Sequence, residues 1–208
     1  MSADPQSARD DIAFLRSLVG DDESVQAAAF GEAYFAGGLI YGIQMLLHAA
    51  IALRLLPDTP LANLAVGLGP TLVFVPVLIW IVRHSRRFAI RGAVGRAIAA
   101  VFSSVGLANL FLVAVIGAVA LSQNSLVVWL IYPCTVFVLQ GMAWLFAYMM
   151  RRRGWYALVA AGWFVCAVAM ALTVSAARPW FIAFAGAGLW LCMALPGWLM
   201  LRNARRPA

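Results

Sequence analysis

The chain has 208 residues, of which 64% are hydrophobic and 11% are charged, and its mean hydropathy is +0.91. Soluble domains carry about a quarter charged residues, so this composition excludes a soluble globular fold. The formal net charge is +7, and every basic residue other than the two histidines is an arginine. In a membrane protein, the bilayer surface explains such a basic balance, so we expect no nucleic-acid partner.

Charge is distributed unevenly along the chain. Residues 1–32 hold seven acidic residues against two arginines, a net charge of −5. The rest holds thirteen arginines against Asp58 alone, a net charge of +12. We therefore divide the chain into an acidic cytosolic segment at residues 1–30, a membrane domain at 31–201 and a basic cytosolic tail at 202–208.

The acidic segment is predicted to contain a short amphipathic helix at residues 5–19, ended by Gly20, and a second helix that leads into the membrane. Its polar face includes Asp10 and Asp11, which argues against binding to an anionic lipid surface. Two interpretations remain open: the helix packs on the protein's own arginine-rich loops, or it docks a partner protein. The apolar residues on one face of this helix are Ala8, Ile12, Leu15 and Val19.

Six apolar stretches follow, each about as long as a helix that crosses the hydrocarbon core. Short polar turns on one side join them in pairs, and arginine clusters separate the pairs on the other side. We predict an all-α membrane protein with six transmembrane helices arranged as three hairpins. The predicted spans are residues 33–53, 61–82, 97–121, 125–150, 156–176 and 180–201.

The arginines also predict the orientation. With the N-terminus inside, thirteen of the fifteen fall on the inner side, and only Arg54 and Arg178 fall outside. Because arginine and lysine accumulate in cytoplasmic loops, we expect a multi-pass protein of the inner (plasma) membrane with both termini in the cytoplasm.

Aromatic and small residues refine this topology. Trp144 is predicted to lie in the aromatic belt at the inner interface, whereas Trp163 and Trp190 are predicted to pack inside the bundle. Gly38 and Gly42 form a GxxxG pattern on the first span, which is typical of close helix packing. This pattern alone does not indicate a dimer, although a homo-oligomer is compatible with it.

The first span carries a stripe of polar and small residues on one face, and His48 in this stripe is the only histidine inside any span. An ionisable group at membrane depth is a candidate functional site. The competing interpretation is a seam of hydrogen bonds across helices, because an unpaired amide in hydrocarbon costs several kcal/mol. The candidate polar seam or ligand path comprises Tyr41, Gln44, His48, Asn109 and Gln140.

Three cysteines, Cys134, Cys166 and Cys192, fall at similar depth on three successive spans. Thiolates of this kind bind soft metals such as Cu(I). Isolated buried cysteines more often behave as small hydrophobic residues, so that is the favoured interpretation, and no cofactor is predicted.

The longest internal loop, residues 83–96, is strongly basic and is expected to lie at the membrane surface. It is either an ordinary cytoplasmic anchor or a binding surface for anionic lipid headgroups. The candidate headgroup contacts are Arg83, Arg86, Arg87 and Arg91.

The sequence contains no glycine-rich phosphate loop, HExxH motif or recognisable Ser/His/Asp set, so an enzyme is not favoured. The favoured hypothesis is a regulatory, sensing or accessory membrane subunit whose N-terminal helix, residues 5–19, docks a partner protein. The second hypothesis is a small, oligomeric transporter or channel with a polar path near Gln44 and His48.

Overall fold

The computed structural model describes the backbone of residues 5–85, 93–174 and 178–204, with side chains from residue 28 onward except at positions 85 and 178. These ranges are helical throughout apart from short turns, and they contain no strand. Six helical segments are long and apolar enough to cross a membrane, which confirms the predicted all-α fold with six membrane-spanning helices.

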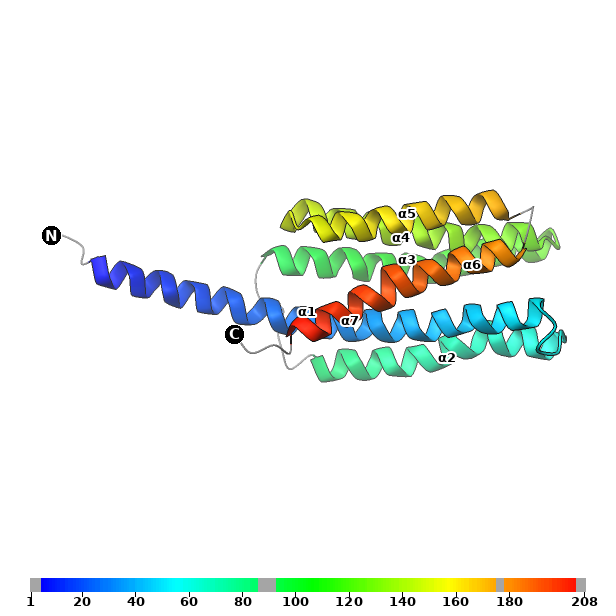
Figure 1. The fold of residues 1–208 in the computed structure, drawn as a ribbon, viewed down its shortest axis with the longest axis horizontal. Coiled ribbons are helices and arrows are strands. Elements are labelled where there is room, and N and C mark those ends of the chain that lie inside the picture. Colours follow the sequence, from blue (N-terminus) through cyan, green and yellow to red (C-terminus); the bar gives the residue numbers. More distant parts are fainter. Residues whose placement is uncertain (1–4, 86–92, 175–177, 205–208) are drawn as a thin grey trace.

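Helices α1 to α5 each provide one span, and the sixth span is made of α6, the π-helical segment η1 and α7 (Figure 1). The elements are α1 (Pro5–Ala52), α2 (Pro60–Ser85), α3 (Ala93–Ser122), α4 (Leu126–Arg151), α5 (Gly154–Thr173), α6 (Arg178–Gly188), η1 (Leu189–Ala194) and α7 (Leu195–Ala204). The spans are Ala28–Ala52, Pro60–His84, Ala93–Ser122, Leu126–Arg151, Gly154–Thr173 and Pro179–Ala204. They lie within a few residues of the predicted ones.

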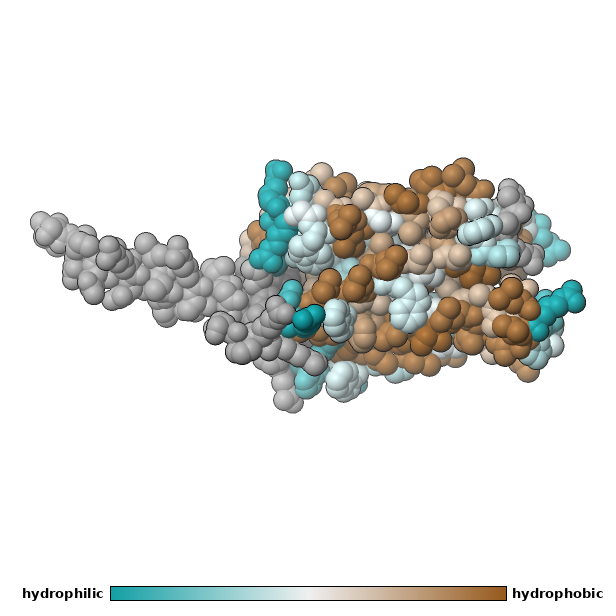
Figure 2. Space-filling model, viewed as in Figure 1, coloured by the Kyte–Doolittle hydropathy of each residue, from teal (hydrophilic) through white to brown (hydrophobic). Residues whose placement is uncertain are grey.

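The surface of the six-helix body has an apolar band with polar residues at its two ends (Figure 2). Large apolar side chains such as Leu72 and Leu158 are exposed within this band. In water such a surface would be strongly unfavourable, whereas hydrocarbon solvates it. The fold is therefore that of a multi-pass membrane protein.

The largest helix interfaces are those of α4 with α5 and of α1 with α7. Neighbours along the chain also pack together: α1 with α2, α3 with α4, and α5 with α6. The predicted hairpins are thus not separate units. The sixth span crosses between α1 on one side and α5 on the other (Figure 1). The least buried spans are α2, which packs mainly on α1, and α3, which packs mainly on α4.

Helix α1 runs without a break from Pro5 to Ala52, so the predicted helix end at Gly20 is wrong. A glycine inside a helix costs only about 1 kcal/mol relative to alanine, and a long cooperative helix tolerates that cost. Gly20 therefore resembles a helix end in the sequence, but the helix continues through it in the structure. The apolar face predicted for residues 5–19 lies outside the described side chains.

Local capping sets the ends of α4. The Ser125 hydroxyl accepts a hydrogen bond from the Val128 N–H at 3.4 Å, as expected of a serine at a helix N-cap. At the other end Arg152 adopts a left-handed conformation with φ of 54°, and its N–H donates to the Tyr148 carbonyl. Both ends of α4 fall within one residue of the predicted span 125–150.

In the sixth span, the Leu195 N–H donates to the carbonyl of Trp190, five residues earlier, so that η1 is a wider π-helical turn. Pro196 follows directly, has no N–H and crowds the carbonyl of the residue four positions before it. The helices around Pro70 and Pro133 remain α-helical, so proline accounts for only part of the π-helical turn.

Glycines bring α1 into direct backbone contact with the sixth span. A Cβ atom added at Gly38 would overlap the backbone of Ala194, and one added at Gly197 would overlap the backbone of Phe35. Gly42, the other member of the GxxxG pattern, lies under the indole of Trp190. The GxxxG pattern therefore serves packing within the chain.

Candidate functional site

A buried chain of hydrogen bonds links α1 to α4. The Tyr34 hydroxyl donates to Oε1 of Gln140, and Nε1 of Trp144 donates to the Tyr34 hydroxyl at 2.9 Å. Tyr34 is 5% exposed and Trp144 is 1% exposed. Gln140 and Trp144 lie one helical turn apart on α4 and so present both polar groups to α1. The chain gives partners to the Tyr34 hydroxyl, the Trp144 indole N–H and the Gln140 carbonyl oxygen.

Aromatic rings surround this hydrogen-bonded chain. The Tyr34 and Trp144 rings meet edge to face, with centroids 5.4 Å apart, and Tyr156 lies at the same distance from Trp144. Phe30 and Phe102 close the cluster from α1 and α3, with centroids 4.6 Å apart. Four helices therefore meet here, and the prediction that Trp144 belongs to the interfacial belt is wrong.

Two residues of the polar stripe on α1, Tyr41 and Gln44, contact α2. The Tyr41 hydroxyl lies 3.4 Å from the hydroxyl of Thr71, and Nε2 of Gln44 donates to the Gly67 carbonyl at 3.3 Å. Gly67 has no side chain to shield its carbonyl, and no neighbouring atom would meet a Cβ at that position. These contacts tie α2, a helix with little other packing, to α1.

A third polar contact joins α3 to α4. The Tyr132 hydroxyl donates to Oδ1 of Asn109 at 2.8 Å. Asn109 was predicted as part of the polar seam, whereas Tyr132 was not. Tyr132 could have been found from the sequence, because its hydroxyl lies inside an apolar stretch and needs a hydrogen-bond partner in hydrocarbon.

His48 lies one turn beyond Gln44 and is half-buried, and none of the hydrogen bonds found in the described ranges involves it. The other predicted path residues each bond to a neighbouring helix rather than to one another. Tyr41 and Gln44 bond to α2, Asn109 to α4 and Gln140 to α1. This arrangement is a set of neutral contacts that hold helix pairs together.

The cysteines do not form one group. Cys134 donates to the Leu130 carbonyl of its own helix at 3.3 Å, whereas Cys166 and Cys192 belong to α5 and η1, which pack against each other. All three are free thiols. No cluster of three or more His, Cys, Asp or Glu side chains suited to a metal ion occurs in the described part of the chain.

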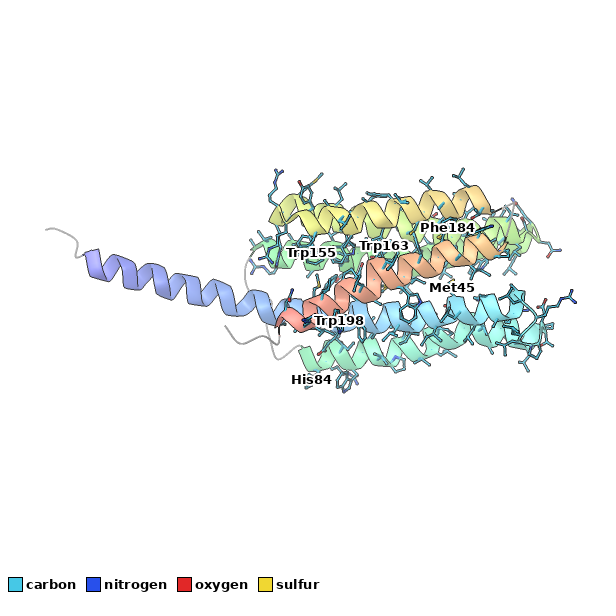
Figure 3. All side chains as sticks on the ribbon, in the orientation of Figure 1. Met45, His84, Trp155, Trp163, Phe184 and Trp198 are labelled. Atoms are coloured by element: carbon cyan, nitrogen blue, oxygen red, sulfur yellow. The ribbon has the colours of Figure 1, made fainter. Side chains whose placement is uncertain are left out.

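Basic and aromatic side chains gather at the end of the body where α7 finishes. His84 and Trp80 stack with centroids 5.4 Å apart, and the Arg202 guanidinium lies 5.4 Å from the Trp198 ring. His84, Trp155 and Trp198 lie toward this same end, while Trp163 lies near the middle (Figure 3). Arg83 is exposed here, and Arg86, Arg87 and Arg91 lie outside the described residues.

Trp163 packs inside the bundle, as predicted. It is 1% exposed and meets the Phe137 ring edge to face, with centroids 4.7 Å apart. Its Nε1 is the one buried side-chain polar atom without a hydrogen-bond partner among those described.

The buried chain can be tested with a double-mutant cycle. Tyr34→Phe and Gln140→Leu each remove one partner of the same hydrogen bond, so we expect a coupling of about 1 kcal/mol in unfolding free energy, within the range of hydrogen bonds between membrane helices. Steric trapping in lipid micelles would measure it. The control cycle pairs Gln140→Leu with Tyr132→Phe, which belongs to a different contact. Equal coupling in the two cycles would contradict the assignment.

No known protein family, no curated protein and no solved structure matches the chain.

Proposed function

We propose that the protein is a regulatory or accessory membrane subunit that docks a partner protein through its acidic N-terminal helix. The observation that carries this proposal is the continuity of α1. Of its 48 residues, 25 belong to the first span, and the remainder projects beyond the six-helix body (Figure 1). At 1.5 Å per residue the projecting part is about 35 Å long.

Continuity of α1 weighs against the interpretation that this segment folds back on the protein's own arginine loops. Such a return would require a break in the helix between residues 5 and 28, and α1 has none. Residues 1–32 carry a net charge of −5, from seven acidic residues against two arginines. A basic surface on another protein is the complementary partner, since opposite potentials steer association.

The same helix provides a way to transmit docking to the membrane domain. Gly38 of α1 lies against the backbone of Ala194 in η1, and Gly197 of α7 lies against Phe35. A tilt or shift of the projecting segment would therefore move the sixth span with it, because close-packed helices shift as units.

The transport hypothesis has less support. Four of its five path residues already have hydrogen-bond partners on neighbouring helices, and only His48 has none in the described ranges. We also propose, from the arginine distribution, that both termini lie in the cytoplasm at the inner membrane. In that orientation Arg83 would face anionic headgroups, and we propose the same role for Arg86, Arg87 and Arg91 from their charge.

Deleting residues 1–20 should release the partner protein while the membrane domain stays folded. The protein would be isolated gently from its native membrane, its bound proteins identified by mass spectrometry, and its unfolding temperature measured. Neutralising Asp10, Asp11, Asp21, Asp22 and Glu23 to the matching amides should also release the partner, without changing the length of the helix. We expect binding to weaken with rising salt.

Asp58→Asn is the matched control, because it neutralises an acid at the opposite end of the body and retains an acceptor for Asn63. It should leave the bound proteins unchanged. An identical set of bound proteins in the deletion variant and the full chain would rule out the docking role.

A further inference from the structure

Cys192 lies directly against α5. It is 7% exposed and belongs to the π-helical segment η1. A Cβ atom added at Gly162 of α5 would lie only 2.5 Å from its sulfur. Glycine at position 162 therefore makes the space that the Cys192 thiol occupies.

Cys166 follows Gly162 by one helical turn, so the two positions share a face of α5. Side chains on an α-helix lean toward its N-terminus, which directs the Cys166 thiol back toward Gly162 and the Cys192 sulfur. Both thiols are free, and they belong to helices that pack against each other.

The pair lies near the middle of its two spans, Gly154–Thr173 and Pro179–Ala204. Cys166 is half-buried, and its neighbours Val165 and Val168 are 67% and 59% exposed on the lipid-facing side. A reagent that reaches this thiol must therefore dissolve in hydrocarbon. A monovalent soft metal such as Cu(I), bound by two thiolates, would leave a net negative charge at this depth, whereas a disulfide is neutral.

We propose that Cys166 and Cys192 form a redox pair that a lipid-soluble quinone oxidises to a disulfide. Two S–H bonds break and one S–S bond forms, and the two electrons and two protons released reduce the quinone to its quinol. Water-soluble thiol couples do not enter the bilayer centre, so the quinone pool sets the state of this pair. The proposal is independent of the docking role.

The disulfide would fix η1 to α5 at the point where η1 also meets α1. Ala194, two residues after Cys192, is the residue against which Gly38 packs. Oxidation therefore joins α5, η1 and α1 into one unit and would restrict relative movement of these helices.

The test uses the full chain in nanodiscs of quinone-free lipid, treated with decylubiquinone. Remaining thiols are alkylated after unfolding, and the protein is digested and examined by mass spectrometry. We expect a linked pair of peptides that contain Cys166 and Cys192, with Cys134 alkylated. The Cys134→Ser variant should give the same linked pair, and Cys166→Ser and Cys192→Ser should each abolish it.

Full alkylation of both cysteines after quinone treatment, or links that involve Cys134 or a second copy of the chain, would overturn the proposal. Ferricyanide, a water-soluble oxidant, should leave the pair reduced under matched conditions. Equal oxidation by ferricyanide would show that the oxidant need not be lipid-soluble and would overturn the assignment to quinones.

Discussion

Replacing Trp144 with alanine is expected to lower the free energy of unfolding by about 3 to 5 kcal/mol, the usual cost of removing a large aromatic side chain from a packed core. Trp144 is 1% exposed, and its ring contacts those of Tyr34, Phe102 and Tyr156. The variant also removes the donor to the Tyr34 hydroxyl. Because the ring joins several helices, the cavity cannot close by the movement of one helix.

Trp80→Ala is the matched control, since Trp80 is 62% exposed on the lipid-facing surface of α2. It should cost less than about 1 kcal/mol, because lipid takes the place of the lost side chain. Steric trapping of each variant in the same lipid micelles would measure both values. Similar losses for the two tryptophans would mean that Trp144 lies at the interface, as the sequence suggested, and not in the core.

The membrane spans could be predicted from the sequence because their length and hydropathy are properties of one continuous stretch. The second span was predicted at 61–82 and is observed at Pro60–His84. The fourth was placed by the polar turn that ends at Ser125, and Ser125 is the N-cap of α4. Such signals are local, and a bilayer leaves few alternatives to a helix.

Partners across helices could not be predicted in the same way. Tyr34 and Gln140 are separated by 106 positions in the chain, and their contact depends on how α1 and α4 are rotated and tilted. Depth alone placed Trp144 near the inner interface. Trp144 is buried because it lies on the side of α4 that faces Tyr34.

The end predicted at Gly20 failed for a different reason. Glycine costs about 1 kcal/mol inside a helix, and α1 continues as a helix on both sides of Gly20. The polar path is a comparable case. Four of its five residues form hydrogen bonds to neighbouring helices, and His48 forms none in the described ranges. The sequence alone could not distinguish a shared path from separate contacts between helix pairs.

The interface between α1 and the sixth span is the contact on which the proposed transmission from the N-terminal helix depends. Gly38→Leu is expected to lower the free energy of unfolding by about 3 kcal/mol, at the upper end of the usual cost of overpacking. The added side chain would overlap the backbone N and Cα of Ala194, and backbone atoms move less readily than a flexible side chain. Either α1 separates from η1, or the sixth span shifts as a whole.

Gly106→Leu provides the control, because no atom lies within 4 Å of a Cβ added at Gly106. The same increase in volume on that lipid-facing position of α3 should raise the unfolding free energy by no more than about 1 kcal/mol, the difference in helix propensity between glycine and other residues. Comparing the two variants separates the effect of the close contact from the effect of replacing glycine in a helix. If Gly38→Leu were as stable as Gly106→Leu, α1 would not meet the sixth span through its backbone, and α1 could not transmit docking to η1 by direct contact.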